Sequence, residues 1–234
     1  MEKQNSKYHG TVYQIAKRIN ERTTDNPRST RLLREAQRIE LAVKSLGDMA
    51  ATKSPTETTA AHFKRVAHSS QRLRNETINA KDRIAVLQQE ASQDIDQRIK
   101  ERLNLIQGDY AGELRSTLRG MDQKERFATI SEIMKQGDGQ SMAAISQAPA
   151  VLSGLSDEIS ARYVEDYTKM YAADLVNERD ALHETASDLA IITSTADKAA
   201  DGFSNPSRLQ SIETEEQAAA EAENSFKGVF EATE

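Results

Sequence analysis

The sequence has no cysteine and no tryptophan, and its aromatic residues are limited to 6 tyrosines and 5 phenylalanines. The lack of cysteine excludes disulfide bonds, thiolate zinc sites and cysteine nucleophiles. No apolar run reaches the roughly 18 residues that a membrane span needs, and residues 1–10 are polar without an apolar stretch. We therefore expect neither a membrane span nor a secretory signal.

Proline and glycine, which interrupt helices, are also scarce, at 4 and 10 residues. Long stretches consist of Ala, Glu, Gln, Arg and Leu, which favour helices. Hydrophobic residues make up 37% of the chain, whereas globular proteins contain roughly 45–50% with glycine included. Because so little apolar material fills only a small compact core, the sequence predicts an elongated all-α fold, in which long amphipathic, coiled-coil-like helices flank a middle segment of short helices.

Proline, glycine and capping residues mark the boundaries of the predicted helices. Ser54 and Glu57 form a capping box with a proline between them, and no further proline or glycine follows until Gly108. One helix over this stretch would be about 80 Å long, whereas a compact sphere of this mass is only about 45 Å across. Gly47 is expected to end a helix over 28–46. Asp122 and Gly137 are expected to begin and end a short helix, and Ser156 is expected to begin the second long helix. The predicted segments are basic N-terminal helices over 1–53, a long helix over 54–108, short helices over 109–155, a second long helix over 156–202, and an acidic C-terminal helix or tail over 203–234.

Each predicted long helix carries a narrow apolar stripe. In the first, apolar residues recur every 11 positions from Leu73 to Ile106, a period that keeps them on one face. In the second, three tyrosines follow each other at steps of four. Charged residues cover the remaining faces, so each stripe needs a partner helix, within the chain or in another chain. The predicted oligomer or partner seam comprises Leu73, Ile84, Leu87, Ile95, Ile99, Ile106, Tyr163, Tyr167 and Tyr171.

The acidic end of the chain carries a second apolar feature. Residues 214–234 are rich in Glu and Ala, and Phe226, Val229 and Phe230 form a small apolar face near the end. An apolar tip on a charged helix is expected to bind another surface. We predict that these three residues are a docking site.

Charge is distributed unequally along the chain. Residues 1–75 contain 15 Lys and Arg against 7 Asp and Glu, a net charge of +8, and the remainder contains 16 against 30, a net charge of −14. The basic part can contact nucleic acid, an acidic partner or the acidic tail of a neighbouring copy, or it can be a solvated face. Only Phe63 accompanies it as a base-stacking aromatic, which disfavours single-strand recognition. The candidate residues are Arg28, Arg31, Arg34, Arg38, Lys64, Arg65, Arg72 and Arg74.

The sequence lacks the motifs of catalysis and of metal binding. Asp180 and His183 have the spacing used in di-iron bundles, but those sites need a second such motif and two more carboxylates. There is no H-E-x-x-H, no G-x-S-x-G and no phosphate-binding G-K-[ST]. The sequence therefore predicts no catalytic residues, no metal, no cofactor and no enzymatic activity, and a cell-wall or nucleic-acid hydrolase is the least supported class. None of the four histidines, His9, His62, His68 and His183, belongs to an H-E-x-x-H motif.

A series of short motifs lies in the middle of the chain and covers about one fifth of it. These motifs are Glu113-Leu114-Arg115, Leu118, Glu125-Arg126, Gly137-Asp138, Ala143-Ala144-Ile145, Ala148-Pro149, Leu152-Ser153-Gly154-Leu155 and Asp157-Glu158. The stretch resembles uncharacterised helical proteins of tailed bacteriophages and prophages, in which a Gly-Asp, an Ala-Pro and a Leu-Ser-Gly-Leu occur in this order. The resemblance implies a phage-encoded product that is part of the particle, and it supplies no active-site residues.

The helical stripes and the opposite charges favour a non-enzymatic structural or assembly protein that works through helix–helix association in a larger complex. With the resemblance, this predicts a tailed-phage virion component of the neck or tail, the internal ejected proteins or the scaffold, assembled in the host cytoplasm. Its expected partners are itself, as a homo-oligomer, and other virion or assembly proteins. The alternative is a nucleic-acid-binding accessory protein that uses the basic N-terminal third.

Overall fold

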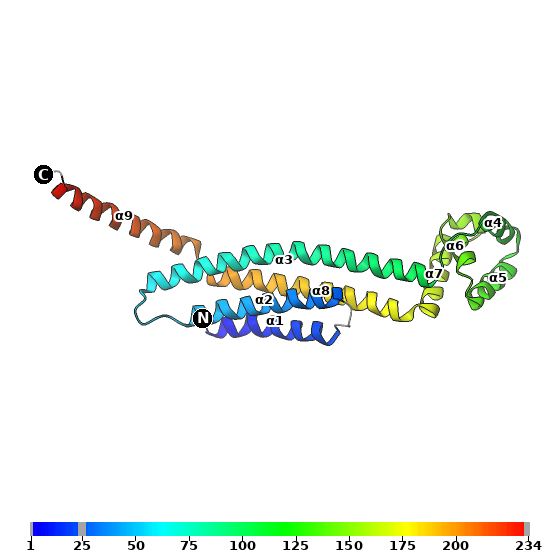
Figure 1. Ribbon diagram of the computed structural model, residues 1–234, viewed down its shortest axis with the longest axis horizontal. Coiled ribbons are helices and arrows are strands. Elements are labelled where there is room, and N and C mark those ends of the chain that lie inside the picture. Colours follow the sequence, from blue (N-terminus) through cyan, green and yellow to red (C-terminus); the bar gives the residue numbers. More distant parts are fainter. Residues whose placement is uncertain (1, 23–26, 232–234) are drawn as a thin grey trace. The chain divides into compact units, whose positions relative to one another are not determined.

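The computed structural model describes residues 2–22 and 27–231, and the side chains of residues 7–22 and 27–228 (Figure 1). These residues form α-helices and one short 3-10 helix without any strand, so the predicted all-α class is confirmed. In chain order the elements are α1 (Glu2–Arg22), α2 (Pro27–Ala51), α3 (Thr59–Arg102), α4 (Ala111–Gly120), α5 (Gln123–Gln136), α6 (Gly139–Ser146), η1 (Ala150–Ser153), α7 (Asp157–Tyr171), α8 (Ala173–Phe203) and α9 (Pro206–Glu231).

The chain divides into two compact units. Unit 1 combines Met1–Leu87 with Thr185–Glu234, and unit 2 is the continuous stretch Gln88–Glu184. The helices α3 and α8 therefore each contribute to both units. This division differs from the five predicted segments because the two halves of one long helix pack with different neighbours.

In unit 1 the helices α1 and α2, the first part of α3 and the second part of α8 lie side by side (Figure 1). Their apolar residues recur at steps of three and four, which places them on one face of each helix. Burial of each large aliphatic side chain contributes about 1.5–3 kcal/mol. The buried residues include Val12, Ile15, Ile19, Leu32, Ile39, Val43, Leu46, Val66, Leu73, Ile84, Leu189, Ile192, Ala196 and Ala199.

Ion pairs at the edge of this core connect the helices of unit 1. The Arg83 guanidinium on α3 donates to both carboxylate oxygens of Glu35 on α2, at 3.1 and 2.9 Å, and to Glu76 at 2.7 Å. Hydrogen bonds to Glu35 and then Glu76 raise the pKa of Arg83 above its usual value. Asp188 on α8, which is only 6% exposed, accepts from Arg18 on α1 at 2.6 Å and from Arg22. These pairs fix α2 to α3 and α1 to α8.

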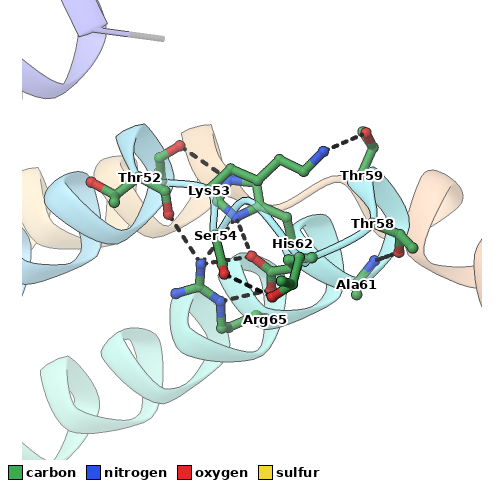
Figure 2. A network of polar contacts seen from close by, with 11 residues as sticks. Thr52, Lys53, Ser54, Thr58, Thr59, Ala61, His62 and Arg65 are labelled. Carbon is green, nitrogen blue, oxygen red and sulfur yellow. Dashed lines mark hydrogen bonds and ion pairs between the residues drawn. The ribbon is translucent and has the colours of Figure 1, made fainter.

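The connection between α2 and α3 differs from the sequence prediction. The long helix was expected to begin at Ser54, but it begins at Thr59, and the Thr58 hydroxyl accepts from the Ala61 amide at 3.1 Å (Figure 2). The Arg65 side chain holds the preceding residues as a loop, because it donates to the Thr52 carbonyl at 3.1 Å and to Glu57 at 3.0 and 3.1 Å. Tertiary contacts therefore override the capping box at Ser54.

The Glu57 carboxylate gives this loop a testable pH dependence. The hydrogen bond from Arg65 lowers the pKa of Glu57 from its usual 4.5. A carboxyl group with a lowered folded-state pKa stabilises the fold above its usual pKa, and this contribution is lost as pH falls through the lower value. We expect an NMR titration to place the Glu57 transition below 4.5 and Arg65→Ala to move it upward. A transition at or above that value in the wild-type chain would contradict the pairing.

Unit 2 contains the short helices, and here several predicted boundaries are confirmed. The Asp122 carboxylate accepts from the Glu125 amide at 2.9 Å at the start of α5, and Gly137, with φ of 69°, ends that helix in the left-handed conformation. The Ser156 hydroxyl accepts from the Ile159 amide at 3.3 Å at the start of α7. These caps depend only on neighbouring residues, which is why the sequence predicts them.

Three other helix boundaries were predicted wrongly. The second long helix, expected over 156–202, is interrupted at Ala172, whose φ of −140° and ψ of 36° separate α7 from α8. The helix α3 stops at Arg102 and is followed by Asn104 with a positive φ of 48°, before the expected end at Gly108. Gly47 lies buried inside α2 instead of ending it.

Two close contacts hold the short helices of unit 2 together. The Arg126 guanidinium on α5 donates to the carbonyls of Leu118 at 2.7 Å, Met121 at 2.8 Å and Gly154 at 2.5 Å. Gly139, the first residue of α6, lies against the end of α3, so close that a Cβ atom there would be 1.7 Å from the Leu103 carbonyl oxygen.

Candidate assembly surfaces

The predicted seam residues lie mostly inside the chain's own core. Leu73 and Ile84 are buried in unit 1, Ile95 and Ile99 are buried in unit 2, and Leu87 is half-buried. The sequence showed that these apolar residues need a helix to pack against. In the structure, other helices of the same chain, distant in sequence, provide it. Of the two kinds of partner that the sequence left open, a helix within the chain or one in another chain, the structure shows the first for these residues.

The tyrosines and Ile106 have separate environments. Tyr167 is buried and Tyr163 is half-buried, and burial raises the pKa of both hydroxyl groups. The Tyr171 hydroxyl donates to the carbonyls of Met134 at 2.9 Å and of Lys135 at 3.0 Å, and so caps the end of α5. Ile106, beyond the end of α3, is 66% exposed. Within the predicted seam, only Ile106 keeps a largely exposed aliphatic side chain.

Acidic side chains of the same chain neutralise half of the predicted basic residues. Four ion pairs do so: Arg38–Glu76 at 3.1 Å, Lys64–Glu216 at 2.5 Å, Arg65–Glu57 at 3.0 Å, and Arg74–Asp201. Arg28 is half-buried at the start of α2. In the described parts of the chain, Arg31, Arg34 and Arg72 have no acidic partner.

The outer face of α2 presents a basic stripe, which we define as Arg31, Arg34, Arg38 and Leu41. These residues follow one another at steps of three, four and three, and all four are exposed. They lie opposite the apolar residues that α2 buries in unit 1. Leu41 is 60% exposed, so the stripe combines guanidinium groups with one accessible aliphatic side chain.

The helix α9 is held at its beginning and exposed afterwards (Figure 1). Near its start the Arg208 guanidinium lies 4.7 Å from the centre of the Phe63 ring, and Glu216 pairs with Lys64 on α3. Every side chain from Glu213 to Gly228 is exposed. Of the three predicted docking residues, Phe226 is 66% exposed, and the side chains of Val229 and Phe230 lie outside the described residues.

One face of α9 has the spacing of a helix-pairing surface. Ile212, Glu216, Ala219, Glu223 and Phe226 follow one another at alternating steps of four and three, the spacing of the a and d positions of a heptad. We call the last four residues the α9 seam. It combines carboxylates with an alanine and an exposed phenylalanine. Such a face suits a partner that offers cations beside an apolar side chain.

Unit 2 has a cleft of about 760 Å³ between α7, the end of α6 and the start of α8. Three cations, Lys100, Lys169 and Arg179, line it together with three carboxylates, of which Glu165 pairs with Lys169 at 2.5 Å. This hydrogen bond lowers the pKa of Glu165. Because positive and negative groups are equal in number, the cleft selects no charge class of ligand.

The described residues contain neither a metal-binding cluster nor a helix that could span a membrane. No three His, Cys, Asp or Glu side chains in that part of the chain are grouped so that they could hold a metal ion. No helix in that part of the chain has both the length and the apolar character needed to cross a membrane. Comparison of the chain with protein-family models, with curated proteins and with solved structures found no match in any of the three.

Proposed function

We propose that this protein is a non-enzymatic structural protein that associates through its helices into a larger complex. The supporting observation is α9, a helix of 26 residues whose side chains from Glu213 to Gly228 are all exposed. Most helices in proteins owe their stability to the packing of one face on another element. The exposed heptad face of α9 is therefore a surface that a partner would cover.

The complex that we propose is the particle of a tailed phage. The motifs between Glu113 and Glu158 support this assignment by their resemblance to phage-encoded helical proteins. The protein would be a component of the neck or tail, an internal ejected protein or a scaffold-type protein, assembled in the host cytoplasm. Its partners would be other copies of itself and other virion or assembly proteins.

The mass of the full chain in solution tests this proposal. The monomer has a mass of 26.0 kDa, and we expect light scattering to give a multiple of that mass that rises with protein concentration. Constant helicity over the same concentrations would show that the chain is folded at each point. A mass of 26.0 kDa at every concentration would contradict the proposed self-assembly.

A nucleic-acid-binding accessory role is the second candidate. Lys64, Arg65, His68 and Arg72 line a groove of about 460 Å³ on α3. Glu216 lines the same groove and pairs with Lys64. Because this carboxylate weakens the attraction of the groove for phosphate, we rank nucleic-acid binding below assembly. Filter binding of DNA should fall steeply as salt is added if the role is correct. If no DNA is retained on the filter even at the lowest salt concentration, the nucleic-acid-binding role is contradicted.

A further inference from the structure

We infer that the α9 seam of one copy docks on the basic stripe of α2 of a second copy, with the two helices parallel. This inference rests on the proposed assembly function and names the two surfaces involved. The occupant of the basic stripe is therefore a segment of this same chain.

Charge complementarity is the first support for this pairing. The helix α9 contains 6 glutamates against one arginine and one lysine. In the basic stripe, Arg31 and Arg34 lack an acidic partner among the described residues, and Arg38 shares Glu76 with Arg83. The helix with excess negative charge therefore matches a stripe whose cations are incompletely neutralised.

The spacing of the two surfaces is the second support. Glu216, Ala219, Glu223 and Phe226 follow one another at steps of three, four and three, and so do the four residues of the basic stripe. In a parallel pair this common spacing sets Glu216 opposite Arg31 and Glu223 opposite Arg38. In the same register Phe226 meets Leu41, the two exposed large apolar side chains of these surfaces. One register therefore satisfies both the charges and the apolar contact.

The position of α9 in its own copy excludes the same pairing within one chain. The Lys64–Glu216 pair holds α9 at the start of α3, where the His62 ring contacts the Ala50 carbonyl at the end of α2. Arg31 lies 19 residues before Ala50 in the same helix, which is about 28 Å away. Glu216 cannot lie opposite its own Arg31 while it pairs with Lys64. A second copy must supply the basic stripe.

Charge reversal on each side, followed by mixing, tests the docking. One variant carries Arg31→Glu and Arg34→Glu, and the other carries Glu215→Arg and Glu223→Arg, beside or within the α9 seam. Each variant alone should self-associate at least about tenfold more weakly than the wild type, because like charges then meet. An equimolar mixture should recover association, since the unchanged α9 seam of the first variant then meets the unchanged basic stripe of the second. Light scattering of the single variants and of the mixture measures both effects.

The control variant carries Glu221→Arg, a charge reversal on the face of α9 opposite the α9 seam, and should associate like the wild type. Wild-type association that survives both reversals, or a mixture that stays monomeric, would overturn the docking and leave the assembly function intact. A monomeric wild type would overturn the assembly function itself. Loss of DNA retention in the Arg31→Glu, Arg34→Glu variant at unchanged mass would make the stripe a nucleic-acid surface and also overturn the docking.

Discussion

Replacement of Gly139 by alanine should lower the free energy of unfolding by about 3 kcal/mol or more, since overpacking against backbone exceeds the usual cost of an added methylene. The added Cβ would be 1.7 Å from the Leu103 carbonyl oxygen and 2.8 Å from that of Asn104. Both obstacles are backbone atoms, so no side chain can rotate away. The helix α6 would have to move from the end of α3, although Met142 and Ile145 on it are fully buried.

Denaturant unfolding followed by circular dichroism measures this effect. The matched control is Gly112→Ala in α4 of the same unit, where a Cβ would have no atom within 4 Å. An alanine in an open helical position should be neutral or stabilise by about 0.5–1 kcal/mol. Equal stability of the Gly139→Ala and Gly112→Ala variants would show that the close approach of α6 to α3 is not required.

Arg126→Met should have the second largest effect, a loss of about 3 kcal/mol in the free energy of unfolding. The guanidinium of Arg126 connects the end of α4 to Gly154 through charge-assisted hydrogen bonds to three carbonyls. Methionine retains much of the apolar stem but leaves these acceptors without their donors. Arg126→Lys should recover only part of the loss, because an ammonium group cannot reproduce the planar fork of the guanidinium.

The control for Arg126 is Arg162→Met on α7. The Arg162 side chain is 83% exposed and pairs with Asp166 only at 3.9 Å. A surface change of this kind should alter the free energy of unfolding by less than about 0.5 kcal/mol. Denaturant unfolding curves measure the change in the free energy of unfolding for both variants. A change below about 0.5 kcal/mol for Arg126→Met would contradict the bridging role of Arg126.

The sequence predicts best those features that depend on neighbouring residues. The caps at Asp122, Gly137 and Ser156 use side chains or backbone conformations within a few positions. The apolar faces of α1 and α2 follow from the spacing of residues such as Val12 and Leu32, both fully buried. Local chemistry and the helical period suffice for these features.

The features that the sequence did not predict depend on residues beyond the neighbouring helical turn. No proline or glycine marks the break at Ala172, where the chain turns beside Tyr171 as that residue caps α5. Glu57 appears in the sequence as part of a capping box, but in the structure Arg65 holds it in a loop. A stripe shows that a helix needs a partner without showing which helix provides it.

The candidate surfaces, too, could be predicted from the sequence only where they depend on neighbouring residues. The sequence identified Arg31 and Arg34 as cations available to a partner, and the structure leaves both exposed. It could not identify the acids that neutralise Arg38, Lys64 and the other paired cations, because those acids lie up to 152 positions away in the chain. The exposure of α9 also depends on which helices fill the core of unit 1, which periodicity does not determine.

The division of the chain has a consequence for the order of folding on the ribosome. Unit 2 is one uninterrupted stretch, whereas unit 1 closes only when Leu189 and Ile192 of α8 reach its core. At a synthesis rate of about 5–20 residues per second, all of unit 2 emerges before those two side chains do. Part of the apolar face of the nascent α1 and α2 therefore stays exposed until α8 has been synthesised. This exposure makes the N-terminal region a candidate for chaperone binding.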